Sequence, residues 1–212
     1  MKKYELTNDI KKVGRRTTLY RIKALKDFGN VCAGDLGGWI EKEENLSQEN
    51  NCWVFGNAWV FGYAKVYGNA EVYGNAGVYG NAEVFGDAEV LGDVKVFGDV
   101  KVFDNAWVFG DARVFGNAKV FGNAKVLGNV EVLGNVEVQN DADFIVFKNW
   151  WSSGRYFTWT RSNNMWKVGC FYGTGKELVD KAYKDSQESG REYQRIVNYV
   201  QDILGLPHIV KI

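Results

Sequence analysis

Valine recurs at every sixth position from Val54 to Val138 without a slip in phase, which makes fifteen consecutive repeats. The usual repeat is Val, an aromatic residue, Gly, Asn or Asp, Ala or Val, and a charged residue, as in residues 66–71. Side chains alternate between the two faces of a strand, so Val and the preceding Ala share one face, and the aromatic and charged residues share the other. The Gly-Asn or Gly-Asp pair then predicts a turn after each short strand, because these residues tolerate positive φ.

Three strands with their turns close a triangular coil of about eighteen residues, so the repeats predict about five stacked coils. Val and Ala point into a narrow prism, and at about 4.8 Å per coil the prism is about 24 Å long. Two positions depart from the pattern, since Asp104 stands in place of a turn Gly and Tyr63 in place of a turn Asn. The pattern therefore predicts an all-β solenoid over residues 53–143.

The segment before the first repeat carries a motif of its own, with ALKDF at 24–28, GGWI at 37–40 and CW at 52–53. It resembles the opening of YdcK-like hexapeptide-repeat proteins, many of which are encoded by phages and prophages. The resemblance extends over residues 20–140 and implies a left-handed parallel β-helix, in a family whose biochemistry is largely undefined. Because a solenoid's end coil exposes unpaired strand edges, we expect residues 1–52 to form an N-terminal β cap, with strands near 4–6 and 19–25.

Residues 144–212 lack the repeat and predict a small ββαα module. Two strands, 156–161 and 165–171, flank Ser-Asn-Asn at 162–164, which is typical of a hairpin. Thr174 with Glu177 predicts a capping box at the start of one helix, and Ser189 with Glu192 predicts the same for a second. The second helix carries an apolar stripe at helical spacing, and Gly205 and Pro207 end it.

The composition of the chain argues against some classes of function and location. The chain has 26 basic and 26 acidic residues, and this zero net charge argues against general nucleic-acid binding, which usually needs a basic excess. The three cysteines are distant from one another and lack metal-site spacing, so free thiols in a reducing cytoplasm are expected. Neither a membrane-length apolar run nor a signal peptide is present, which predicts a cytoplasmic protein, in the host cell's cytoplasm if it is phage-encoded.

The sequence also argues against catalysis. Hexapeptide-repeat solenoids are best known as acyltransferases, which usually place a catalytic His between subunits, but the single His here is His208, outside the repeats. One His cannot supply a three-His zinc site, and the regular repeats contain no inserted loop to cover a substrate. Gly173 to Lys176 lacks the full phosphate-loop pattern and is better explained as a helix start. We therefore expect a non-enzyme with no cofactor and no metal.

The outward aromatic position is the first candidate for function. Phe or Tyr follows Val in eleven of the fifteen repeats, and reading every eighteenth residue stacks them into ladders on all three sides. Such ladders stabilise the solenoid by ring stacking at about 0.5–1.5 kcal/mol per pair, or they form an interface between copies. We expect a homo-oligomer, either a dimer or a trimer. The candidate self-association residues are Phe61, Tyr79, Phe97, Phe115, Trp53, Trp59 and Trp107.

The second candidate is an aromatic and basic cluster after the solenoid, because Trp, Tyr and Arg are enriched at binding hot spots. The alternative is that several of the Trp side chains form the core of a small module. The candidate partner-binding residues are Trp150, Trp151, Arg155, Tyr156, Trp159, Arg161, Trp166 and Lys167.

These features favour a non-catalytic interaction protein, with the solenoid as a rigid scaffold and the C-terminal module as the binding surface. Its phage setting, implied by the resemblance, suggests stoichiometric inhibition of a host protein such as a CRISPR-type defence effector. Two alternatives remain: a sponge that binds a small nucleotide signal between subunits, and a degenerate hexapeptide acyltransferase.

Overall fold

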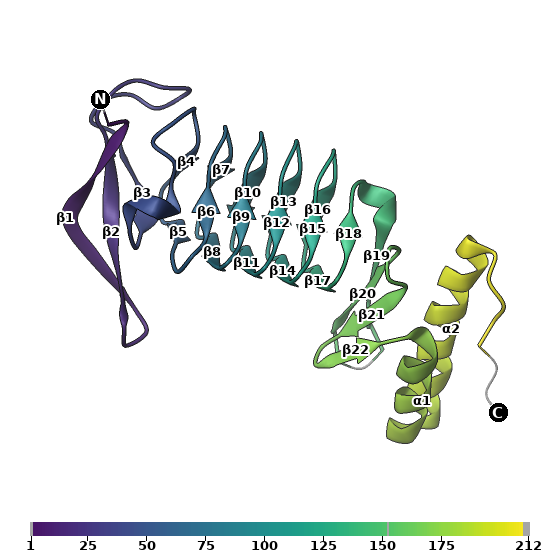
Figure 1. The fold of residues 1–212 in the computed structure, drawn as a ribbon. Helices are drawn as coiled ribbons and strands as arrows, with labels where there is room; N and C mark the ends of the chain where they lie inside the picture. The colour runs from purple at the N-terminus through teal and green to yellow at the C-terminus, as the bar shows by residue number, and fades with distance from the viewer. Residues whose placement is uncertain (1, 152, 210–212) are drawn as a thin grey trace. The chain divides into compact units, whose positions relative to one another are not determined.

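The computed structural model describes residues 2–151 and 153–209, and the chain divides into two compact units, Met1–Asp143 and Phe144–Ile212. Each unit is described by itself. The first is a parallel β-solenoid with an N-terminal strand region, and the second is a sheet with two helices (Figure 1).

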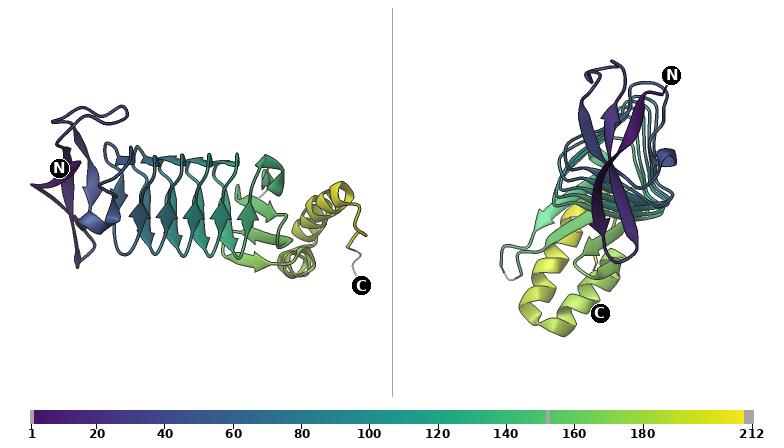
Figure 2. Two further views of the ribbon diagram at one scale, coloured as in Figure 1. Left: turned by 45° about the horizontal axis from the view of Figure 1, so that its top comes forward. Right: turned by 90° about the vertical axis from the view of Figure 1, so that its left-hand side faces the viewer.

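The solenoid has three sides, which we name face A, face B and face C (Figure 2). Face A comprises β5 (Trp59–Val60), β8 (Gly77–Gly80), β11 (Lys95–Gly98), β14 (Arg113–Gly116) and β17 (Glu131–Gly134). Face B comprises β4 (Trp53–Val54), β7 (Glu71–Val72), β10 (Glu89–Gly92), β13 (Trp107–Gly110) and β16 (Lys125–Gly128). Face C comprises β6 (Lys65–Val66), β9 (Glu83–Val84), β12 (Lys101–Val102), β15 (Lys119–Val120) and β18 (Glu137–Val138), and a short 3-10 helix, η2 (Asp141–Asp143), follows it.

The register confirms the eighteen-residue coil that the valines predict. Val90 pairs with Val72 on one side and Val108 on the other, in parallel strands. Every repeat Val from Val54 to Val138 is at most 1% exposed. The residue two positions before it is equally buried, and it is Cys52 in the first repeat and Ala or Val in the others. The core of this unit is therefore a column of small side chains, and the narrow prism leaves the larger ones outside.

The turns explain why Gly recurs. Gly98 has φ of +87°, and a Cβ there would lie 2.8 Å from the carbonyl oxygen of Gly116 in the next coil. The position therefore needs both left-handed backbone and close approach of two backbones, which together favour Gly. Asp104 occupies the same position in its repeat with φ of +58°, as an acidic residue that tolerates this region better than most.

The N-terminal region continues the sheet of face A. Strands β1 (Tyr4–Val13) and β2 (Thr17–Ala24) form an antiparallel hairpin, and β2 pairs with β3 (Leu36–Ile40). Strand β3 then pairs in parallel with β5, placing Ile40 beside Val60, and Leu46, just after the 3-10 helix η1 (Glu43–Asn45), forms a bridge with Val66. Parallel stacking thus begins before Trp53, inside the segment that the sequence suggested was only a cap.

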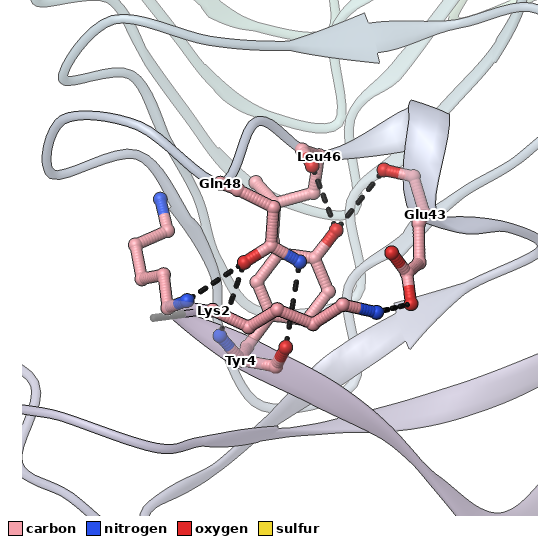
Figure 3. A network of polar contacts seen from close by, with 6 residues as sticks. Lys2, Tyr4, Glu43, Leu46 and Gln48 are labelled. Carbon is pink, nitrogen blue, oxygen red and sulfur yellow. Dashed lines mark hydrogen bonds and ion pairs between the residues drawn. The ribbon is translucent and has the colours of Figure 1, made fainter.

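Buried polar groups hold this N-terminal region together (Figure 3). The hydroxyl of Tyr4 donates to the carbonyl oxygens of Glu43 at 3.0 Å and Leu46 at 2.7 Å, while the side-chain oxygen of Gln48 accepts from the backbone N–H of Lys3 at 2.8 Å. Lys3 is 1% exposed and its Nζ donates to the carbonyl oxygen of Cys52 at 2.9 Å. Burial lowers the pKa of Lys3 and raises that of Tyr4.

The second unit is a four-stranded antiparallel sheet followed by two helices. Its strands are β19 (Phe144–Lys148), β20 (Tyr156–Thr160), β21 (Met165–Val168) and β22 (Phe171–Gly173), and its helices are α1 (Gly175–Asp185) and α2 (Gln187–Leu204). The predicted hairpin is β20–β21, and two further strands, one on each side of it, were missed. Phe157, Leu178 and Val197 belong to its core, which joins sheet and helices.

The helix termini confirm one sequence prediction and correct another. Thr174 caps α1 through a capping box with Glu177, as expected, and Gly205 ends α2 with φ of +64°. The expectation that Ser189 caps α2 was wrong, because Ser186 is the N-cap and its side chain accepts from the backbone N–H of Ser189. Ser189 lies inside the first turn of α2.

Candidate interaction surfaces

The outward aromatic residues form stacked ladders on the solenoid. On face A, the rings of Tyr79 and Phe97 are 5.0 Å apart at an angle of 1°, and Phe97 and Phe115 are 5.0 Å apart at 6°. Phe61 stacks on Tyr79 at 5.0 Å. Stacking therefore accounts for part of each ladder, but every one of these aromatic residues also remains partly exposed.

Face A carries a group of Trp side chains and cations beside its ladder. The indole of Trp59 is half-buried and lies over Gly77, where a Cβ would be 2.6 Å from the indole Nε1. Lys11 and Lys95 place Nζ 5.5 Å and 5.0 Å from the ring centroid of Trp59, within cation–π range. Strand β3 adds Trp39, with the guanidinium carbon of Arg21 5.5 Å from its ring and Lys11 5.8 Å from it.

The cations of face A lie close enough to repel one another. Burial lowers the pKa of Lys95; the carboxylate of Asp93 opposes this shift, and Lys11 and Arg113 add smaller contributions that lower it further. Arg113 lies 3.7 Å from Glu131 in the next coil. Among the residues that the structure describes, no salt bridge is formed by Lys11, Arg21 or Lys95.

Face B carries neighbouring carboxylates where face A carries neighbouring cations. Glu71 and Glu89 are cross-strand neighbours in successive coils, and the pKa of Glu71 is raised, first by burial and then by the charge of Glu89. Trp107, in the same column, is 40% exposed, with Nζ of Lys125 5.4 Å from its ring. This face therefore presents two adjacent carboxylates and an open indole.

Face C pairs its own charges. Lys101 forms a salt bridge with Glu83 at 3.2 Å, and Lys119 forms one with Glu137 at 2.9 Å. The hydroxyl of Tyr67 donates to Glu83 at 3.2 Å, and burial together with this carboxylate raises the pKa of Tyr67 to about 12.

Trp53 is a correction to the predicted self-association residues. It is 1% exposed, with its ring 5.9 Å from that of Tyr4 and 5.3 Å from that of Phe28. The N-terminal segments cover it, so it is not available to a second copy in this fold. The sequence interpretation also missed Lys95 and Arg113, although reading the charged position at every eighteenth residue could have found them.

Two predicted partner-binding residues are likewise core residues. Trp159 and Trp166 are 1% and 2% exposed and pair across β20 and β21 on the side that faces the helices. The indole N–H of Trp159 donates to the side-chain oxygen of Asn164 at 2.8 Å. For these two residues, the alternative of a packed core is therefore the correct one.

The remaining residues of the cluster lie nearer the surface. Trp150 is 82% exposed and meets the ring of Trp151 edge-on at 6.1 Å, while Trp151 is half-buried against Phe157 and Tyr193. Arg155 is exposed, and Tyr156 beside it is half-buried with Nζ of Lys148 5.7 Å from its ring.

Arg161 does not join this group, and Lys167 approaches it only at Gly169, against which the Arg155 side chain lies. Arg161 follows the opposite end of β20, in the hairpin turn, and Lys167 lies partly buried in β21, where its Nζ donates to the carbonyl oxygen of Gly169. The structure therefore brings together Trp150, Trp151, Arg155 and Tyr156, which we name the Trp150 surface.

Other candidate chemistry is sparse in the described part of the chain. His208 contacts Asp202 at the end of α2, and the three cysteines are free. No group of three His, Cys, Asp or Glu side chains is arranged to hold a metal among the described residues, and none of their helices is long and apolar enough to span a membrane.

A hollow of about 500 Å³ lies on the solenoid where Tyr63 replaces the turn Asn. Its lining includes Lys42 and Lys65, with Nζ of Lys42 4.9 Å from the ring of Tyr63, but also the carboxylates of Glu44 and Glu83. The mixed charges make it a poor site for the phosphates of a nucleotide, because two carboxylates oppose the two lysines.

Comparison with known proteins supports the fold. No family model matches the chain. A stretch is 37% identical over 62 residues to the protein named "Uncharacterized acetyltransferase YdcK" of Escherichia coli (strain K12), which covers 26% of this chain and 19% of that protein. The chain thus matches about a fifth of that relative's length. Together with the solenoid, this similarity identifies a hexapeptide-repeat architecture, while the expectation of phage origin stays a prediction.

Proposed function

We propose that this protein is a non-catalytic binding protein, in which the solenoid is a rigid support and the C-terminal unit binds a partner through the Trp150 surface. The observation that carries the proposal is the indole of Trp150, which is 82% exposed. Such an exposed indole loses the hydrophobic stabilisation of burial, about 25 cal/mol per Å² of apolar area, unless a partner covers it.

The neighbours of Trp150 fit a binding role. Trp151 is packed on Phe157 and Tyr193, so it supplies a rigid base at little conformational cost. Arg155 and Lys148 add positive charge at the rim, which favours a partner with an acidic surface. The partner class expected from the family resemblance is a host protein that is inhibited stoichiometrically, such as a CRISPR-type defence effector.

Affinity capture with a matched pair of variants tests this proposal. Trp150→Ala should reduce retention of a specific, stoichiometric partner by at least about tenfold, because hot-spot truncation costs about 2 kcal/mol or more. Tyr199→Ala is the control, since it removes another aromatic side chain of the same unit that is 55% exposed. Equal retention by the wild type and Trp150→Ala, with both folded, would refute the role of this surface.

Acyl transfer is the second candidate, favoured by the similarity to a protein named as an acetyltransferase. The chain's single His, His208, lies in the C-terminal unit and outside the repeats. Calorimetric binding of acetyl-CoA, followed by transfer to an acceptor, would establish this function over the first. The nucleotide-sponge alternative, in which the ligand binds between subunits, is tested by thermal shift with cyclic nucleotides, and no stabilisation would count against it.

A further inference from the structure

The three faces of the solenoid differ in how their charged side chains are arranged and paired. Face C also sets two cations side by side, Lys101 and Lys119, but each forms a salt bridge with a carboxylate of the same face, Glu83 and Glu137 respectively. On face A, Lys95 is the cross-strand neighbour of Arg113 and forms no salt bridge among the described residues, and on face B the carboxylates of Glu71 and Glu89 are adjacent. Placing like charges side by side destabilises a single copy, so the arrangement on faces A and B calls for a partner with the opposite charge.

We propose that face A of one copy packs on face B of a second copy of this chain. Residues six apart in the eighteen-residue coil occupy adjacent faces at the same level, and the coils of Lys95 and Glu131 are the ones in which the two faces carry opposite charges. Lys95 of face A is then level with Glu89 of face B, and Arg113 is level with Trp107. One coil further, Glu131 is level with Lys125, so the sign of the charge reverses on both faces together.

Among copies whose solenoid axes run in the same direction, contacts between identical faces lack this match. In a two-fold contact parallel to the solenoid axis, face A would set Lys95 on Lys95, and face B would set Glu89 on Glu89. The complementary contact is instead heterologous, so each copy uses both faces and the contact repeats from copy to copy. The partly exposed residues Phe97 and Phe115 are then covered at the same contact.

The charged side chains of faces A and B are long enough to meet across the proposed contact. Strands of two copies with parallel axes run in opposite directions where the faces meet. The charged column of one face therefore lies diagonally across from that of the other, about 7 Å along the strand. Extended Lys and Glu side chains cover that offset, and the exposed ion pairs make the contact sensitive to salt.

Charge reversal followed by charge exchange tests the proposal. Sedimentation velocity of the full-length chain at low and high salt should show concentration-dependent assembly, weakened by high salt. Lys95→Glu and Glu89→Lys should each weaken assembly at least about tenfold, and the double variant should restore it, because the pair is re-formed with its signs exchanged. Lys101→Glu on face C is the matched control and should leave assembly unchanged.

Three experimental results would contradict the proposed contact. A strict monomer at all concentrations, or an equal loss with Lys101→Glu, would overturn the proposal, as would a double variant no better than the single ones. Circular dichroism of each variant establishes that it is folded. Trp150→Ala should assemble like the wild type, so failure of the proposed partner surface and failure of this interface are distinguishable.

Discussion

The indole of Trp59 covers Gly77, the residue one coil further along face A. A Cβ at Gly77 would lie 2.6 Å from Nε1 and 2.9 Å from Cε2 of this ring, closer than side chains tolerate. Gly77 stands where other repeats carry a charged residue, and it has no positive φ to explain it. The absence of a side chain at Gly77 is therefore what lets Trp59 lie flat against the face, between Lys11 and Lys95.

Substitution of Gly77 by Ala should displace this ring. We expect Gly77→Ala to lower the free energy of unfolding by about 1–3 kcal/mol, the usual cost of overpacking, as measured by urea denaturation. In a Trp59→Ala background the same change should cost much less, because the clash is gone. Additive effects of the two substitutions would contradict the proposed contact.

The sequence predicted the solenoid core well, since one inward position per repeat is a property of local alternation. It could not predict how exposed each Trp would be among those that occupy the charged position of the repeat. Trp53 is 1% exposed, Trp59 half-buried and Trp107 40% exposed, and the difference comes from Tyr4 and other distant segments. Exposure, and hence the make-up of each candidate surface, depends on long-range packing that a local pattern does not contain.

The misassigned helix start has a similar cause. Ser189 and Glu192 match the capping pattern, but α2 begins earlier, at Gln187, with Ser186 as its cap. A Cβ at Gly190 would be 2.2 Å from the ring of Tyr183 on α1, so Gly190 is the point of closest approach of the two helices. Gly190 therefore serves the packing of α1 on α2, and the Ser189 and Glu192 pattern around it does not mark the start of the helix.

Alanine substitution distinguishes the contributions of Ser186 and Ser189 to stability. Ser186→Ala should lower the free energy of unfolding by about 1 kcal/mol, because the N–H of Ser189 loses its cap. Ser189→Ala should change it by less than about 0.5 kcal/mol, since the Ser189 side chain is not the cap. Thermal denaturation followed by circular dichroism compares the two, and the reverse order would restore the sequence-based assignment.

Two turn glycines provide a test of coil stacking. Gly98 and Gly128 both have positive φ, but only at Gly98 would a Cβ meet the next coil, at 2.8 Å from the carbonyl oxygen of Gly116. Gly128→Ala should therefore cost about 1 kcal/mol from backbone strain alone. Gly98→Ala should cost about 3 kcal/mol, because overpacking adds to the strain. Equal losses in urea denaturation would show that the coils do not approach this closely.

Alkaline titration tests the environment of Tyr67. Burial first, and then the carboxylate of Glu83, raise its pKa to about 12, above the ordinary value of about 10. The folded-state pKa exceeds the unfolded one, so Tyr67 contributes full stability below about pH 10 and loses that contribution as the pH rises through 12. The difference in phenolate absorbance between the wild type and Tyr67→Phe isolates this group. Glu83→Gln should lower the midpoint but leave it above the ordinary value, because burial remains, and a wild-type midpoint near 10 would contradict the proposed environment.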